Sequence, residues 1–182
     1  MSTVDVTTWY LEQTSPADAG APVPAPEGVH VQRAEIESPE LSRFLYTAVG
    51  QDVTWTDRLS WDYARWAKEL EGTQTWVAYE RGTPAGYAEL APREDGSVEI
   101  VHFGLLPAFR GRCIGAHLLS YATARAWDLA GPEGRVWLHT CSKDGPHARA
   151  NYTRRGFRVY RTEVEREETV ATPGPWPGAL AR

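Results

Sequence analysis

Apolar side chains recur at helical spacing in several parts of the chain. The clearest helix start is at Ser38-Pro39, an N-cap followed by a first-turn proline, and Gly50 can end that helix. Its apolar positions lie three and four residues apart, as one buried helix face requires: Leu41, Phe44, Leu45, Ala48 and Val49. The same spacing predicts further helices over residues 60–70, 114–130 and 146–155.

Shorter runs of β-branched and aromatic residues predict strands around these helices. They cover residues 29–34, 75–80, 85–91, 98–106, 136–141 and 157–165. Turn-like residues at 81–84 and 93–96 join three of these strands directly, so those three should pair antiparallel. The helix over 114–130 separates two strands and implies one parallel step. The fold class is therefore α+β, with a mixed, mostly antiparallel sheet and helices on both faces.

The length of 182 residues suits one domain with additions at its ends. Residues 4–14 predict a strand, whereas residues 15–28 are rich in Ala and Pro and predict an extended linker. Three prolines near the carboxyl end indicate a loose tail. We therefore divide the chain into an N-terminal strand and linker (1–28), a main domain (29–167) and a Pro-rich tail (168–182).

Composition and charge narrow the classes of function. With 42% hydrophobic and 11% aromatic residues, the chain can form a packed core. The formal net charge of −5 argues against nucleic acid as a partner, because affinity for its phosphates depends on Lys and Arg. Cys113 and Cys141 lack CxxC spacing and His-rich neighbours, so we expect no metal site. Long apolar runs and a signal-peptide pattern are absent, so we expect no membrane span and a cytoplasmic location.

The strongest chemical signal lies in residues 98–119, where an apolar strand passes through a loop into a helix. The residues of the loop and the helix start are Arg110, Gly111, Arg112, Cys113, Gly115 and Ala116. The first N–H groups of a helix, its dipole and two guanidinium groups all favour an anion, and small residues let a phosphate approach. The Lys-Ser/Thr ending of a P-loop is absent, and the glycine spacing is not that of a dinucleotide fingerprint.

This segment resembles the pyrophosphate-binding motif of the GNAT N-acetyltransferase superfamily, Arg/Gln-x-x-Gly-x-Gly/Ala. Here it stands as Arg110-Gly111-Arg112-Cys113-Ile114-Gly115, with Cys113 at the first glycine position of the family. The family's late helix and its Gly-Phe ending are matched by Ala148, Tyr152, Gly156 and Phe157, while Gly145 stands at the family's asparagine position. The resemblance covers residues 29–165 and is strongest from 98 to 157.

The resemblance implies an N-acetyltransferase that uses acetyl-CoA as cosubstrate and an amine as acceptor. The cofactor-binding residues that it implies are Phe103, Leu105, Arg110, Gly111, Arg112, Cys113, Gly115 and Ala116. Glu99 would take a proton from the amine, whose pKa of ~10.4 leaves it charged at neutral pH, and Glu89 is the reserve candidate. The N–H of Phe103 would hold the oxyanion, and Tyr152 would donate to the departing thiolate.

Several of these residues also have a purely structural interpretation. Glu99 can be an exposed carboxylate at a strand start, and Tyr152 can be a packed helix aromatic. The sequence favours His102, with apolar neighbours, as a hydrogen-bonded core histidine rather than a base. Between the first two helices, Asp57 is flanked by Trp55 and Trp61, which either receive a cationic amine or only pack that loop.

Three functions remain open at this point. The first is acetylation of a primary amine, on a small molecule before a protein. The second is a protein lysine or N-terminal acetyltransferase, suggested by the histone-acetyltransferase-like residues around Glu99. The third is a non-catalytic acyl-CoA-binding sensor, which Cys113 and Gly145 favour because they depart from the family pattern. A homodimer is left open.

Overall fold

The computed structural model describes residues 3–169, which form a 7-stranded sheet. Its strands are β1 (Thr3–Gln13), β2 (Val29–Ala34), β3 (Gln74–Glu80), β4 (Thr83–Pro92), β5 (Ser97–Leu105), β6 (Arg135–Cys141) and β7 (Arg158–Glu168). They lie in the order β2-β3-β4-β5-β6-β1-β7. The pairing of β5 with β6 is parallel and the other pairings are antiparallel, which confirms the predicted fold class.

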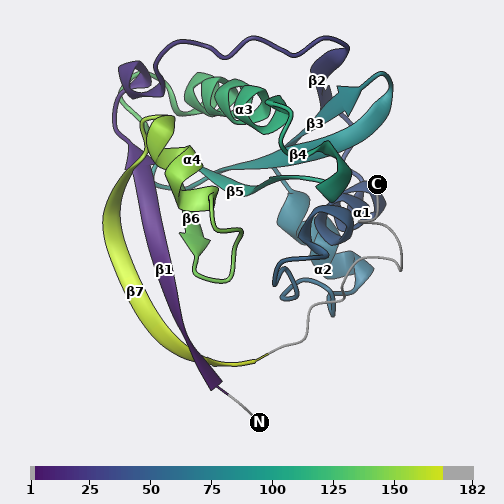
Figure 1. The fold of residues 1–182 in the computed structure, drawn as a ribbon, viewed down its shortest axis with the longest axis vertical. Helices are drawn as coiled ribbons and strands as arrows, with labels where there is room; N and C mark the ends of the chain where they lie inside the picture. Colours follow the sequence, from purple (N-terminus) through teal and green to yellow (C-terminus); the bar gives the residue numbers. More distant parts are fainter. Residues whose placement is uncertain (1–2, 170–182) are drawn as a thin grey trace.

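Helices cover both faces of the sheet (Figure 1), as the sequence predicts. They are α1 (Pro39–Gly50), α2 (Tyr63–Leu70), α3 (Ile114–Ala130) and α4 (Ala148–Arg154), with short 3-10 turns η1 (Pro16–Ala19) and η2 (Pro107–Phe109). The side chain of Ser38 caps α1 as predicted. The helix α2 begins at Tyr63 rather than at residue 60, because the Asp62 carboxylate accepts a hydrogen bond from the Arg65 N–H and so sets the first turn.

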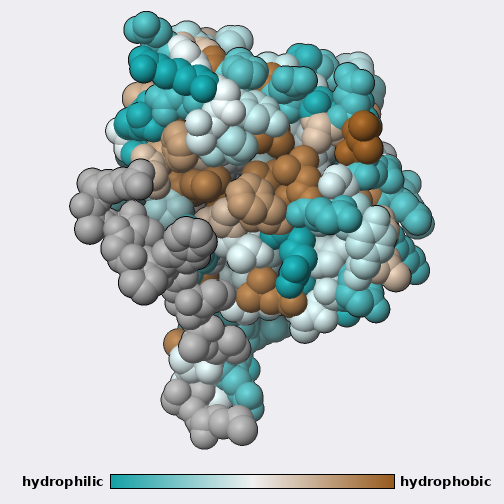
Figure 2. All heavy atoms as spheres, turned by 90° about the vertical axis from the view of Figure 1, so that its right-hand side faces the viewer, coloured by the Kyte–Doolittle hydropathy of each residue, from teal (hydrophilic) through white to brown (hydrophobic). Residues whose placement is uncertain are grey.

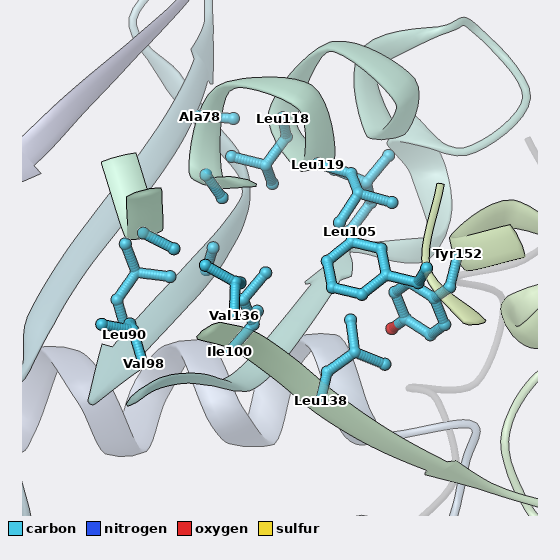
Figure 3. Close-up of a cluster of buried hydrophobic side chains, with 14 of the residues drawn as sticks. Ala78, Leu90, Val98, Ile100, Leu105, Leu118, Leu119, Val136, Leu138 and Tyr152 are labelled. Carbon is cyan, nitrogen blue, oxygen red and sulfur yellow. The ribbon is translucent and has the colours of Figure 1, made fainter. Parts of the chain in front are cut away.

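Two clusters of buried side chains hold the helices on the sheet. The larger one joins α3 and α4 to the central strands, and Figure 3 shows Leu118 and Leu119 of α3 above Leu138 of β6 and Leu105 of β5. The smaller one, on the α1 side, consists of Leu45, Val49, Val77 and Tyr87. Figure 2 turns the right-hand side of Figure 1 to the viewer and shows hydrophobic residues gathered across its middle between hydrophilic ones.

The N-terminal strand β1 lies inside the sheet. It pairs antiparallel with both β6 and β7, and β1 and β7 curve side by side away from the helices (Figure 1). A strand was predicted here, but outside the domain of residues 29–167; in the structure it is part of the same sheet. The linker that follows is held against α3, because Val23 N–H donates to Ser120 Oγ at 3.0 Å.

The predicted tail begins inside β7, which continues to Glu168. Residues 170–182 lie outside the described residues, so the prediction of a loose Pro-rich tail stays a prediction for them. Within residues 3–169 no helix is long and apolar enough to cross a membrane.

Candidate functional site

The two parallel strands at the centre of the sheet separate soon after they meet. Their register covers Ser97–Glu99 on β5 and Arg135–Trp137 on β6. Beyond that point β5 stays paired with β4, while its residues 100–105 line a cavity on the β6 side. Alternate peptide groups of a strand point to opposite edges, so the separation leaves part of the β5 main chain facing this cavity.

The cavity has a volume of about 1080 Å³ and runs along β5 to the start of α3. Its lining includes most of the site residues predicted from the sequence: Phe103, Leu105, Arg110, Gly111, Cys113, Gly115, Ala116 and Tyr152. Two predicted residues, Glu99 and Arg112, are not among its lining residues. The structure therefore brings together one wall of the predicted cofactor site.

The start of α3 forms one end of this cavity. The helix is 17 residues long, and its first-turn residues Gly115 and Ala116 line the cavity. Residues of α4 line the same cavity, among them Asn151 and Arg154, to which the sequence assigned no role. Helix N–H groups next to guanidinium groups make this end suitable for a phosphate-bearing ligand.

Both arginines of the loop before α3 are ion-paired to acidic residues far away in the sequence. Arg110 binds the Asp52 carboxylate with two nitrogens, at 2.5 and 2.9 Å, and its hydrogen bond holds the pKa of Asp52 below the usual value. Arg112 binds Glu80 in the same two-nitrogen manner, at 3.1 and 2.5 Å. In this structure Arg110 therefore joins the segment after α1 to the cavity wall.

The residue at the first glycine position of the motif adopts a backbone conformation that favours glycine. Cys113 is the N-cap of α3, with φ of 62° and ψ of 0°, and it is exposed at the cavity. A left-handed conformation costs an L-residue roughly 1–2 kcal/mol, whereas glycine adopts it freely.

We expect Cys113→Gly to raise the free energy of unfolding by about 1 kcal/mol, because glycine removes this backbone strain. The variant should bind acetyl-CoA at least as tightly as the parent protein. Urea unfolding and calorimetric titration measure the two quantities. Arg81→Gly is a matched control, since Arg81 also has a positive φ, of 50°, but does not line the cavity. A lower affinity of Cys113→Gly alone would show that the thiol contacts the ligand favourably.

Tyr152 reaches the cavity from α4. Its ring packs on Phe103 of β5 at 6.0 Å and on Phe157 at 6.3 Å between ring centroids (Figure 3 shows its place beside Leu138). Burial raises the pKa of the Tyr152 phenol well above the usual value, so the hydroxyl keeps its proton and can donate it in a hydrogen bond.

The turn after α4 leaves no space for a side chain at Gly156, where a Cβ would lie 1.8 Å from Asp18 O.

Glu99 lies beside the cavity wall and is 4% exposed. The guanidinium of Arg93 binds one of its oxygens, and His139 Nδ1 lies 3.4 Å from the other. Burial raises the pKa of Glu99, but the hydrogen bonds of His139 and Arg93 outweigh it and leave the pKa below the usual value. His139 lines the cavity, so Glu99 is connected to it through this ring.

His102 also lines the cavity, and here the sequence prediction is wrong in one respect. The ring is largely buried, as expected of a core residue, but its Nδ1 atom has no hydrogen-bond partner among the described residues. The nearest acceptor is Glu89 Oε1, at 3.6 Å.

Within residues 3–169 no group of three or more His, Cys, Asp or Glu residues is arranged to hold a metal ion.

Comparison with known proteins gives the class of protein that this fold and cavity define. The model of the acetyltransferase (GNAT) family matches residues 34–157, which is more than half of the chain. The chain belongs to this family.

Two curated relatives are similar over part of their length. Mycothiol acetyltransferase of Nocardia farcinica is 35% identical over 97 residues, which are 53% of this chain and 30% of that protein. L-2,4-diaminobutyric acid acetyltransferase of Streptomyces avermitilis is 26% identical over 111 residues, which are 60% of each. The chain therefore spans less than two thirds of the length of these relatives.

Solved structures share the fold. A GCN5-related N-acetyltransferase from Kribbella flavida superposes with a TM-score of 0.62 at 22% identity, over 89% of this chain and 58% of that one. An acetyltransferase of Bacillus subtilis in complex with CoA gives a TM-score of 0.57 at 20% identity, over 73% of this chain and 78% of that one.

Proposed function

We propose that this protein transfers the acetyl group of acetyl-CoA to the primary amine of a small molecule. The observation that carries the proposal is the separation of β5 from β6, which leaves one edge of β5 facing a cavity that reaches the start of α3. An extended pantetheine chain can pair with such an edge as an added strand does. Phe103 lies midway along this edge, where its N–H would hold the oxyanion.

The two ends of the cavity suit the two ends of the cosubstrate. The pyrophosphate would bind at the first turn of α3, where Gly115 and Ala116 leave room, and Arg154 of α4 also lines the cavity. In this arrangement Arg110 contributes by holding the segment around Asp52 against the loop, and its own contact with the pyrophosphate stays a prediction. The Tyr152 hydroxyl would donate a hydrogen bond to the thiolate as the C–S bond breaks.

An amine acceptor fits the chemistry of the remaining wall. Asp57 lines the cavity together with Trp55 and Tyr46, whereas Asp144 and Glu167, also in its lining, already bind Thr140 and Lys143. Carboxylates and aromatic faces both attract a cation, so an ammonium group would be drawn to this side. The names of the two curated relatives refer to small-molecule acceptors, which supports a small amine before a protein.

A panel of diamines, amino acids, amino sugars and lysine peptides tests this proposal. CoA release should depend on a small amine, and mass spectrometry should find that amine acetylated. Activity on peptides alone would support a protein acetyltransferase, and saturable acetyl-CoA binding without turnover on any amine would support a sensor. The cytoplasmic location and the homodimer left open by the sequence stay predictions.

A further inference from the structure

A buried carboxylate lies directly behind the acceptor side of the cavity. Glu89 of β4 is 1% exposed, and Arg58 Nη1 donates to its Oε1 at 3.1 Å while Ser42 Oγ donates to its Oε2 at 3.2 Å. Arg58 is itself buried and also binds Glu69, at 3.2 Å. Buried charges persist only when they are paired, and Glu89 is held in place by two independent donors.

His102 lies between this carboxylate and the cavity. It is the register partner of Glu89 across β4 and β5, and its Nδ1 faces Glu89 Oε1 at 3.6 Å. The other ring contacts are aromatic: Trp55 at 5.0 Å, Tyr46 at 5.1 Å and Tyr87 at 6.4 Å between centroids. The charged and titratable groups around the ring are thus Glu89, Arg58, Tyr46 and Tyr87.

We propose that His102, oriented by Glu89, takes the proton from the attacking amine; this inference rests on the proposed function. A histidine with Nδ1–H directed at a carboxylate presents Nε2 as a proton acceptor. His102 immediately precedes Phe103, the predicted oxyanion donor, and consecutive Cα atoms are ~3.8 Å apart. The ring is therefore attached next to the expected position of the thioester carbonyl.

The proton balance of the step is simple. The ammonium first gives one proton to water, and the free amine forms a C–N bond with the thioester carbon. The attacking nitrogen passes its second proton to His102 Nε2, and the electron pair of the C–S bond leaves with the sulfur. The thiolate accepts a hydrogen bond from Tyr152 and takes up a proton from water, while His102 releases its proton to water.

The predicted base Glu99 is less suited to this step. It does not line the cavity, and Arg93 binds one of its oxygens while His139 Nδ1 lies 3.4 Å from the other. It could act only through His139, which lies on β6 across the opening. His102, by contrast, lines the cavity itself, and its Nδ1 faces the buried Glu89 carboxylate at 3.6 Å.

The first test is independent of turnover. Two-bond ¹H–¹⁵N correlation spectra of the ring nitrogens, assigned by loss of one signal set in His102→Gln, should show neutral His102 as the Nδ1–H tautomer. The Nε2–H tautomer would overturn the proposal, because Nε2 could not then accept a proton.

The second test compares variants on an amine that the parent protein acetylates. His102→Gln should lower kcat/KM at neutral pH by about 100-fold, with acetyl-CoA affinity within about twofold of the parent. His139→Gln should cost less than about tenfold, and His30→Gln, at the far edge of the sheet, should match the parent. A larger loss in His139→Gln than in His102→Gln would overturn the assignment in favour of Glu99. If the parent protein acetylates no amine, the proposed function itself is contradicted. The tautomer measurement tests only the role of His102.

Discussion

Replacing Glu89 by glutamine is expected to lower the free energy of unfolding by about 3 kcal/mol at neutral pH. The substitution keeps the size of the side chain but leaves the Arg58 guanidinium, only 6% exposed, without its buried counter-charge. Breaking a buried ion pair from one side costs roughly 3–5 kcal/mol, and the remaining contact of Arg58 with Glu69 places the loss at the lower end. Urea unfolding measures it, with the exposed Glu94→Gln as control.

The size of this loss should depend on pH. Burial raises the pKa of Glu89, but His102 and Arg58 outweigh it and bring the pKa to about 2, below its ordinary value of 4.5. The folded state therefore gains stability from the ionised carboxylate above pH 4.5 and loses this gain as the pH falls towards 2. The difference between parent and variant should shrink over that range. A difference that is equal at pH 7 and at pH 3 would contradict the pairing.

Replacing Tyr152 by phenylalanine should lower kcat about tenfold to hundredfold, with acetyl-CoA affinity close to that of the parent. The ring would keep its packing on Phe103 and Phe157, so only the hydrogen bond to the departing thiolate would be lost. A hydrogen bond to a charged group contributes ~1.5–3 kcal/mol, which sets this range.

Steady-state kinetics and calorimetric titration separate these two effects. Tyr160→Phe is the matched control, because Tyr160 lies exposed on β7 and does not line the cavity. An unchanged kcat in Tyr152→Phe would leave the tyrosine with a packing role only. A large loss of acetyl-CoA affinity would point instead to a hydrogen bond in the ground state.

Much of the fold could be predicted because its signals are local. Residues 114–130 carry an apolar stripe, and the structure has α3 at those bounds, ended by Gly131 with a φ of 73°. The place of β1 could not be predicted in this way. Its residues indicated a strand, but the choice of β6 and β7 as partners depends on pairings more than a hundred residues apart, which no local pattern encodes.

The same distinction applies to the site. The motif around Gly115 is contiguous in sequence, so its position at the cavity could be expected. The ion pairs around the cavity could not be predicted, because their partners are far apart in the sequence. Asp52 lies 58 residues from Arg110, and Glu89 lies 31 residues from Arg58. The environment of His102 was hidden for a further reason: a register shift follows Glu89 in the pairing of β4 with β5, so simple alternation does not show which face the ring takes.

Calorimetric titration with acetyl-CoA tests the central claim, that the opening between β5 and β6 is a site for this cosubstrate. We expect saturable binding with one molecule per chain. Acetyl-pantetheine should bind more weakly, because it lacks the pyrophosphate expected at the start of α3. Absence of saturable binding at millimolar acetyl-CoA would contradict the claim, and equal affinity for both compounds would contradict the pyrophosphate site.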